Sequence, residues 1–285
     1  MSENERIKFN PPTVPAVYDL DNAVYHESEG LSSSGLKLFK RAPIYYYDRY
    51  LAPDRESAKE TPALLLGTQI HTAVLEPDRY FRDYYPLPEK YDLRTKQGKA
   101  DFEYHEAKAK AENKQVISAE SHDICQRIAE AIHESAAASF FFTEDGDVEK
   151  SYYWLDEKTG VLCKCRPDKL LTGFPITIDL KSSTDCSPLA FARDVYNYGY
   201  HISAEFYRRG IAAVTGRQID TFIWPVFEKE RPYACAFYQA SPAMLEYAAA
   251  EIDRLLEKFA ACQKECVWEG YPDEVSVIEL PAWVK

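Results

Sequence analysis

The stretch CRPDKLLTGFPITIDLKSS, residues 165–183, decides which fold the chain can adopt. Its second half, Pro175 to Leu180, has the apolar character of a strand, yet it ends with Asp179 and Lys181 two residues apart. Alternate side chains of a strand point to the same face, so the carboxylate and the ammonium share one face while the apolar residues share the other. An unpaired buried charge costs several kcal/mol, so the polar face must meet solvent, a ligand or a metal. The spacing alone is more often a simple ion pair at a strand end.

Two more carboxylates can reach the same place. Asp168 lies upstream behind a proline, with room for a turn at residues 171–173 and a return along the neighbouring strand to Asp179. Glu149 stands on the preceding strand and can join them, although it can equally pair with Lys150 or Lys164 across a hairpin. Carboxylate oxygens are the ligands that Mg²⁺ and Mn²⁺ prefer.

A histidine adds a fourth candidate ligand. Residues 61–77, TPALLLGTQIHTAVLEP, predict a helix with Thr61 as N-cap, Pro62 in the first turn and Pro77 as the stop. His71 is expected to face inward, because it belongs to a stripe at helical spacing. The other members of that stripe are Leu64, Thr68 and Leu75. A lone inward histidine is more often a core residue than a ligand.

The remaining pattern predicts an α/β protein. Helices are expected within residues 31–43, 99–113, 118–138, 187–197, 200–215 and 241–264, and strands at 147–154, 160–166, 174–181, 220–227 and 233–240. Asp, Lys and Gly between the first two strands predict a hairpin turn. This order favours one central mixed sheet covered by helices. Residues 1–23 are expected to be irregular, and residues 24–285 to form a single domain with helices at its N-terminal side.

Bulk composition limits the possible partners. The net charge of −12 argues against wholesale binding of nucleic acid, because neutralising phosphates requires Lys and Arg. Local basic clusters remain, although solvated surface charge is their commonest explanation. They comprise Lys37, Lys40 and Arg41, then Lys164, Arg166 and Lys169, then Arg208, Arg209 and Arg217. The polar start and the lack of an apolar run near ~20 residues predict a cytoplasmic protein without a membrane span.

Five motifs in a fixed order carry a resemblance. They are Gly67-Thr68-x-x-His71, Pro167-Asp168, Asp179-Leu180-Lys181, Tyr200-His201-x-x-x-x-x-Tyr207, and the opening YHESEGLSSSGLKLFKRAPIYYY at residues 25–47. Together they resemble the PD-(D/E)xK nuclease superfamily, in particular the RecE-type exodeoxyribonuclease VIII nuclease domain, over roughly residues 24–240. The resemblance implies a restriction-endonuclease-like fold, with a central mixed β-sheet flanked by helices.

The resemblance also implies roles for individual residues. Asp168 and Asp179 match the metal-binding carboxylates, and Lys181 matches the lysine that orients the attacking water and stabilises charge on the phosphate. Glu149 stands at the place of the upstream acidic residue, and His71 at that of the histidine in the metal site. These four acidic and basic residues, Glu149, Asp168, Asp179 and Lys181, are therefore the expected catalytic set. Expected DNA contacts are Lys37, Lys40, Arg41, Arg166, Tyr200, Ser203 and Tyr207, with Ser203 where the family usually has glutamine in a Tyr-x-x-Gln pattern.

The implied activity is a metal-dependent DNA exonuclease. It would use Mg²⁺, with Mn²⁺ able to substitute, and digest duplex DNA ends 5′→3′ to leave 3′ single-stranded tails for recombination. A ring-shaped homo-oligomer, a RecT-like single-strand annealing partner and a phage or prophage setting are implied as well. The alternatives are a RecB- or Cas4-like endonuclease or single-strand exonuclease, and a catalytically silent DNA-binding protein. No iron–sulfur cluster is expected, because Cys163-x-Cys165 and Cys262-x-x-x-Cys266 lack the closely spaced cysteine group that such a cluster needs.

Overall fold

A six-stranded mixed sheet forms the centre of the computed structural model, which describes residues 9–55, 61–136 and 138–280. The strands follow the order β11-β10-β8-β7-β4, and β9 also pairs with β10. Both β8 and β9 run parallel to β10, whereas the β10–β11, β7–β8 and β4–β7 pairs are antiparallel. Their bounds are β4 Gly146–Val148, β7 Lys169–Leu171, β8 Ile176–Ile178, β9 Lys181–Ser183, β10 Thr221–Glu228 and β11 Cys235–Gln239. The predicted central mixed sheet is confirmed.

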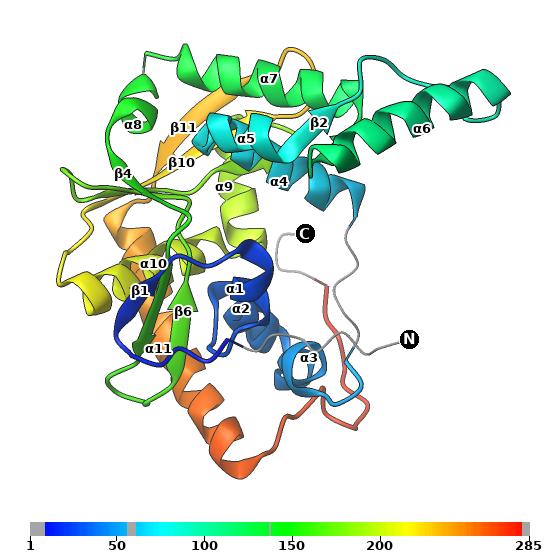
Figure 1. Ribbon diagram of the computed structural model, residues 1–285. Helices are drawn as coiled ribbons and strands as arrows, with labels where there is room; N and C mark the ends of the chain where they lie inside the picture. The colour runs from blue at the N-terminus through cyan, green and yellow to red at the C-terminus, as the bar shows by residue number, and fades with distance from the viewer. Residues whose placement is uncertain (1–8, 56–60, 137, 281–285) are drawn as a thin grey trace.

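Helices cover both faces of this sheet (Figure 1). One face packs on α4 (Pro62–Leu75), α5 (Pro77–Asp83) and α7 (Ala119–His133), and the other on α9 (Pro188–Asn197) and α10 (Tyr200–Thr215). Strand β10 contributes to both faces: Phe222 and Trp224 pack with α9 and α10, whereas Phe227 packs with α4, α5 and α7. Ile178 and Leu180 also pack on the side of α4, α5 and α7, as the alternation within residues 175–180 predicts.

A second, three-stranded sheet is separate from the central one. It has the order β1-β5-β6, with β1 Ala16–Tyr18, β5 Ser151–Leu155 and β6 Leu162–Cys165, and it packs on α2 (Ser33–Arg41), α10 and α11 (Pro242–Glu265). The β5–β6 hairpin confirms the predicted turn. Strand β1 pairs with β5, so part of the segment expected to be irregular belongs to a sheet.

Two predicted strands are each broken in two. The strand expected at 147–154 divides into β4 and β5 because Glu149 has φ 52°, in the left-handed region, and an L-residue there cannot continue a pleated strand. The strand expected at 174–181 divides into β8 and β9 at Asp179–Leu180, where the Leu180 N–H donates to the Asp168 carboxylate instead of a neighbouring strand. Both breaks lie at the same corner of the molecule as the candidate site.

The stripe predicted for α4 is wrong, although the helix and its Thr61 cap are confirmed. The helix docks through Gln69, Ile70, Ala73 and Val74, while Leu64 is 61% exposed. His71 consequently lies at the edge of the buried face, partly accessible, rather than inside the core.

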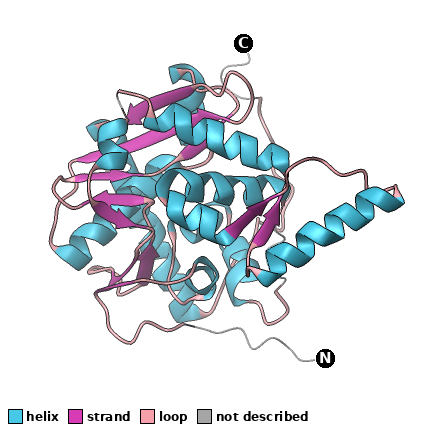
Figure 2. Ribbon diagram, turned by 45° about the horizontal axis from the view of Figure 1, so that its top comes forward, coloured by secondary structure: helices cyan, strands magenta, loops and turns pink. Residues whose placement is uncertain are grey.

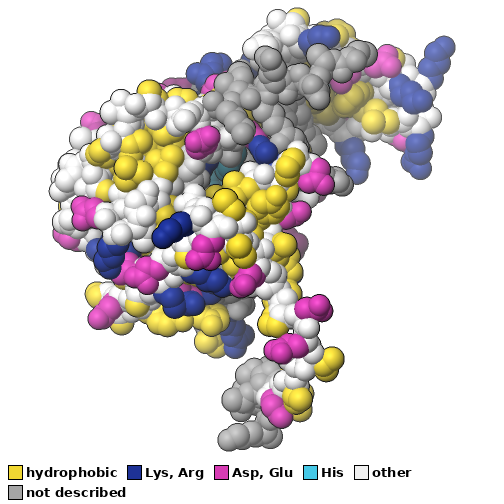
Figure 3. Space-filling view, turned by 90° about the horizontal axis from the view of Figure 1, so that it is seen from below, with side chains coloured by type: hydrophobic (Ala, Val, Ile, Leu, Met, Phe, Trp, Pro, Cys, Tyr) yellow, Lys and Arg dark blue, Asp and Glu magenta, His cyan; other side chains and the backbone are white. Residues whose placement is uncertain are grey.

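The other elements lie at the periphery. They are α1 Asn22–Glu27, α3 Pro43–Tyr46, the π-helical turn Tyr47–Leu51, α6 Lys96–Ala111, α8 Ser139–Thr143, and the parallel pair β2 Tyr84–Pro86 and β3 Gln115–Ile117. Helix α6 projects from the rest of the molecule (Figure 2). Residues 272–280 form an extended C-terminal arm, along which hydrophobic and acidic side chains stand off the body (Figure 3). Within the described ranges, no helix combines the length and the apolar character that crossing a membrane requires.

Candidate active site

Two adjacent strand ends bring Glu149 and Asp168 together. Glu149 follows β4 and Asp168 precedes β7, the antiparallel neighbour of β4, and the Glu149 N–H donates to the Asp168 carbonyl at 3.1 Å. His71 approaches from α4, with its Nδ1 3.4 Å from Asp168 Oδ2. One ligand atom from each of these three residues lies within 4.8 Å of the other two. The structure thus places three of the predicted metal ligands around one point.

Asp179 and Lys181 lie next to the group formed by His71, Glu149 and Asp168. Asp168 Oδ2 accepts a hydrogen bond of 2.5 Å from the Leu180 N–H, which fixes Asp168 to the break between β8 and β9. Asp179 forms an ion pair with Lys181, and the side chains of the two are only 4% and 17% exposed. Asp179 is not among the three residues whose ligand atoms lie within 4.8 Å of one another, and its carboxylate pairs with the ammonium of Lys181.

The electrostatics show that carboxylates are crowded here. Burial, and then the negative charge of Asp179, raise the pKa of Asp168 to about 8. Burial and the neighbouring Asp168 raise the pKa of Glu149 to about 7, against the opposing effect of Arg166. Burial disfavours the charged form of Lys181, but Asp179 and Asp168 outweigh it and raise the lysine pKa. Burial lowers the pKa of His71, which keeps a neutral imidazole available as a ligand.

The donor set fits a hard divalent cation. The two carboxylates supply the oxygen ligands that Mg²⁺ and Mn²⁺ prefer, and the neutral imidazole adds one nitrogen ligand to the set. The raised pKa values of Glu149 and Asp168 indicate that positive charge near these buried carboxylates is insufficient, and a bound cation would supply it. His71, Glu149 and Asp168 are therefore the residues that would hold the ion.

Arg166 has a different position from that expected of a DNA contact. Its side chain is buried, its Nε donates to Glu149 Oε2 at 2.7 Å, and its Nη1 donates to the Leu20 carbonyl at 2.8 Å. This geometry fits an arginine that fixes the orientation of Glu149. Sequence reasoning missed the pairing, since Glu149 stands 17 residues away.

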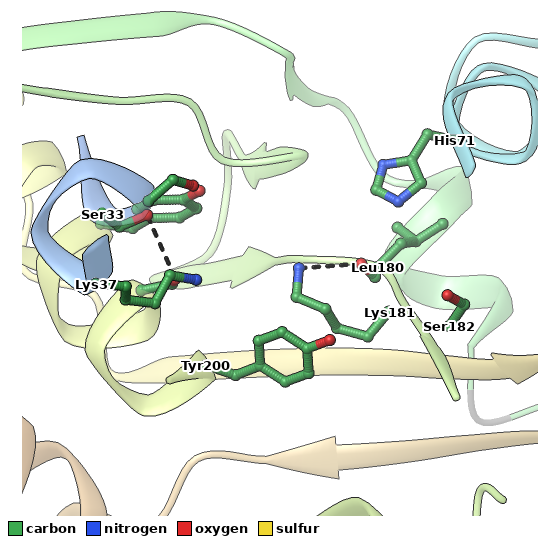
Figure 4. Close-up of a pocket in the computed structure, with 10 residues that line it drawn as sticks. Ser33, Lys37, His71, Leu180, Lys181, Ser182 and Tyr200 are labelled. Carbon is green, nitrogen blue, oxygen red and sulfur yellow. Dashed lines mark hydrogen bonds between the residues drawn. The ribbon is translucent and has the colours of Figure 1, made fainter. Parts of the chain in front are cut away.

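A polar pocket of about 280 Å³ opens in front of Lys181 (Figure 4). Its walls come from α2, α4, α10 and the β8–β9 break, and include the predicted DNA-contact residues Lys37, Tyr200, Ser203 and Tyr207. Lys37 Nζ donates to Ser203 Oγ at 3.2 Å, and Ser203 Oγ in turn lies 3.3 Å from Ser33 Oγ. Burial, and then the charge of Lys181, lower the pKa of Lys37 to about 8.

Ser33 and Ser34 line the same pocket and were not singled out from the sequence. They occupy the first turn of α2, directly after the N-cap Ser32, which accepts from the Gly35 N–H. The run of three serines before an amphipathic helix was the signal that could have identified them.

The other two predicted DNA contacts lie outside the pocket. Lys40 pairs with Glu251 at 2.8 Å and stays partly exposed. Arg41 is exposed and stacks on the Tyr45 ring, with its guanidinium carbon 3.8 Å from the ring centroid.

A second pocket, of about 350 Å³, is lined by Glu149. Its walls include Arg166, Arg79 and Arg82, with Asp19 among the acidic residues. The candidate metal ligands thus lie between two pockets, with His71 lining one and Glu149 lining the other.

The cysteines are not members of the group of candidate metal ligands. Cys163 and Cys165 are buried in the core beneath α10, and Cys262 packs half-buried against the same core. Burial raises the pKa of Cys165 well above its usual range, so its thiol stays protonated.

The sheet order and the acidic corner define a PD-(D/E)xK nuclease-like domain. The chain belongs to the family described as PDDEXK-like domain of unknown function (DUF3799), whose model matches residues 32–281. The chain is similar to a solved structure from Eubacterium rectale named “Putative exonuclease”, at 15% identity over 94% of this chain and 100% of that chain, with a TM-score of 0.56. That likeness shows the fold alone.

A second solved structure, an alkaline exonuclease (LHK-Exo) from Laribacter hongkongensis, matches at 15% identity over 61% of this chain and 87% of that chain. Its TM-score of 0.26 is too low to carry an argument. No curated protein matches the chain.

Proposed function

We propose that the protein is a divalent-metal-dependent nuclease that hydrolyses phosphodiester bonds of DNA. The observation that carries this proposal is the convergence of His71, Glu149 and Asp168 within 4.8 Å, beside the ammonium of Lys181 at a polar pocket. Family membership supports it, because the chain retains Asp168, Asp179 and Lys181 in the order of the PD-(D/E)xK signature.

The protein residues divide the work of hydrolysis. A bound Mg²⁺ or Mn²⁺ ion would lower the pKa of the attacking water and neutralise charge on the phosphoryl oxygens. Lys181 stays cationic because Asp179 and Asp168 raise its pKa, and its ammonium is positioned to stabilise the charge that develops on the phosphate. Asp179 holds that ammonium in place.

The pocket in front of Lys181 supplies groups that can hold a phosphate. Lys37 offers a second ammonium, and the hydroxyls of Ser33 and Ser203 form a chain of hydrogen bonds with it. Charged and hydroxyl donors of this kind fix the DNA backbone without reading its sequence. Ser203, at the position where the family usually has glutamine, thus has a role in orienting Lys37.

From the resemblance alone, we also propose that the protein digests duplex DNA ends in the 5′→3′ direction and leaves 3′ single-stranded tails for recombination. A homo-oligomer is also proposed, and the C-terminal arm supports it. Val275, Val277 and Ile278 on the arm are almost fully exposed, and a contiguous exposed apolar segment of this kind marks an interaction site. Light scattering on the full chain, and on a chain ending at Gly270, tests the oligomer. The annealing partner and the phage setting stay predictions.

The activity is tested with linear and covalently closed duplex DNA of the same sequence, in Mg²⁺, Mn²⁺ or EDTA. The expected result is release of nucleotides from linear DNA only, with either ion, and none in EDTA. Duplexes labelled at either the 5′ or the 3′ end give the polarity. Cleavage of the closed circle would favour the Cas4-like endonuclease instead, and retention of DNA without any hydrolysis would favour a silent binding protein.

A matched pair of variants links the activity to the site. Asp168→Asn removes a metal-holding carboxylate with almost no change of volume, and it should abolish cleavage. Asp156→Asn, on the β5–β6 turn, is the control and should cleave like the natural protein. Equal activity of the two variants would contradict the assigned site.

A further inference from the structure

Two exposed tyrosines beside the pocket have no role in the mechanism above. Tyr196 and Tyr198, at the end of α9 and in the turn to α10, are 64% and 60% exposed. The Tyr198 ring lies 5.6 Å from the ring of Tyr200, which lines the pocket. The exposed aromatic surface therefore continues directly from the pocket.

The turn that carries these tyrosines is fixed against α2. Gly199 has φ 64°, and a Cβ built there would lie 2.7 Å from Lys37 Cδ, so a side chain at this position would collide with the lysine. Tyr196 is held from behind by buried His201, whose ring is parallel to it within 6° at a centroid distance of 6.0 Å. One face of the Tyr196 ring is thus fixed by the protein while most of its surface stays open.

Lysines accompany the tyrosines along the same surface. Lys37 Nζ lies 5.9 Å from the Tyr200 ring centroid, and Lys40 Nζ, one helical turn further along α2, lies 5.9 Å from that of Tyr196. On the pocket side, Lys181 Nζ lies 5.2 Å from the Tyr200 centroid. Ammonium groups and aromatic rings therefore follow each other outward from Lys181 along the α2 side of the pocket.

We propose that Tyr196 and Tyr198 form a stacking platform for unpaired bases of the DNA strand whose end enters the pocket, with Lys37 and Lys40 beside its phosphates. This inference rests on the proposed nuclease function and adds the part of the substrate that is held outside the pocket. Aromatic rings next to a positively charged path are how proteins bind single strands without sequence preference. The platform would keep the end of a duplex open by holding the bases of the cut strand.

The test measures binding apart from cleavage. A fluorescein-labelled oligothymidine of about 20 nucleotides, longer than the site of a single small domain, is titrated in EDTA at low salt and followed by anisotropy. Tyr196→Ala and Tyr198→Ala should each weaken binding about tenfold, as expected for the loss of one base–aromatic stack. The two Tyr→Phe variants should bind like the natural protein, because the ring and not the hydroxyl makes the contact.

Tyr104→Ala is the matched control, since Tyr104 is 65% exposed on the distant helix α6, and it should bind like the natural protein. The platform is overturned if Tyr196→Ala and Tyr198→Ala bind the oligonucleotide with the same affinity as the control. So would phenylalanine variants that lose as much binding as the alanine variants. A change in molar mass by light scattering with unchanged binding would show that the tyrosines form a subunit interface instead.

The same proteins are then assayed for cleavage of linear duplex DNA with Mn²⁺. A natural protein that releases no nucleotides refutes the proposed function, whatever the binding result. A natural protein that cleaves, with alanine variants unchanged in both KM and single-strand affinity, refutes the platform alone. The expected result is a raised KM for the alanine variants with little change in kcat.

Discussion

Replacing Lys181 by alanine tests the electrostatic balance of the site most directly. Lys181 and Asp179 form a buried ion pair, and Asp168 lies close enough that both carboxylates raise the pKa of the lysine. Lys181→Ala removes the positive charge and leaves Asp179 buried next to another carboxylate. The metal-free variant should therefore be less stable than the metal-free natural protein.

The size of the effect follows from the burial of the pair. Removing one partner of a buried pair costs about 3–5 kcal/mol, and we expect the lower end because Asp179 can relieve the cost by taking up a proton. For a chain of this size, a loss of about 3 kcal/mol lowers the melting temperature by about 6–12 °C. Adding Mn²⁺ should restore more stability to the variant than to the natural protein, because the ion supplies the charge that the ammonium supplied. Cleavage should fall by about 10²–10³-fold or more.

Thermal melting followed by circular dichroism, in EDTA and in Mn²⁺, measures both effects. Lys158→Ala is the control: Lys158 pairs with Asp253 at 2.7 Å on the surface, where an ion pair contributes little, so its melting temperature should barely change. The double variant Lys181→Ala/Asp179→Asn should recover much of the lost stability, since it removes the unpaired charge. The reasoning is refuted if Lys181→Ala melts like Lys158→Ala, or if the double variant is the least stable of all.

Three other predictions concern the candidate metal ligands. Because folding raises the pKa of Glu149 to about 7 and of Asp168 to about 8, these two carboxyl groups bind more protons in the folded metal-free protein than in the unfolded chain, and the stability that they contribute is lost as pH rises from about 5 to 8. The change in melting temperature from pH 5 to pH 8 in EDTA should therefore be more negative for the natural protein than for Asp168→Asn, which lacks one of these groups. Added Mg²⁺ should stabilise more at pH 8 than at pH 6, and an equal pH dependence of the natural protein and Asp168→Asn in EDTA would contradict the raised pKa of Asp168. His71→Ala should weaken Mn²⁺ binding in calorimetry while leaving single-strand binding in EDTA unchanged; loss of both would indicate misfolding. Arg166→Ala should weaken Mn²⁺ binding about 10–100-fold because Glu149 loses its fixed orientation, with partial recovery in Arg166→Lys, and unchanged affinity would remove the positioning role.

Local signals sufficed to predict most of the fold. The alternation from Ile176 to Leu180 assigns Ile178 and Leu180 to the core under α4 and α7, where the structure has them. Thr61 and Pro62 mark the start of α4 correctly, because capping depends on a few neighbouring backbone groups. Such features depend on residues close in sequence, which is why a single sequence reveals them.

The errors arise where distant segments decide the outcome. The face of α4 was mispredicted because the helix is apolar nearly all round, so several stripes fit equally well and only packing against α7 selects Ile70 and Val74. Nothing local indicates that Glu149 adopts a left-handed conformation, which ends β4 and turns its carboxylate toward Asp168. The same holds for Arg166, whose second hydrogen bond reaches the Leu20 carbonyl 146 residues away.

The charge of the site bears on how an acidic protein could act on the proposed polyanionic substrate. In the candidate site, the carboxylates of Glu149, Asp168 and Asp179 are matched by the cationic groups of Lys37, Arg166 and Lys181, so the ionised site has no net positive charge before a metal binds. A divalent cation would make the site positive at the place proposed for the phosphate, whereas the chain as a whole has a net charge of −12, which repels DNA. For the proposed nuclease, productive contact with DNA would then be confined to the metal-loaded pocket and to the lysines of α2 beside it. Such a distribution supports the proposed activity on DNA ends, because the side of a longer duplex would bring more phosphates against the acidic surface.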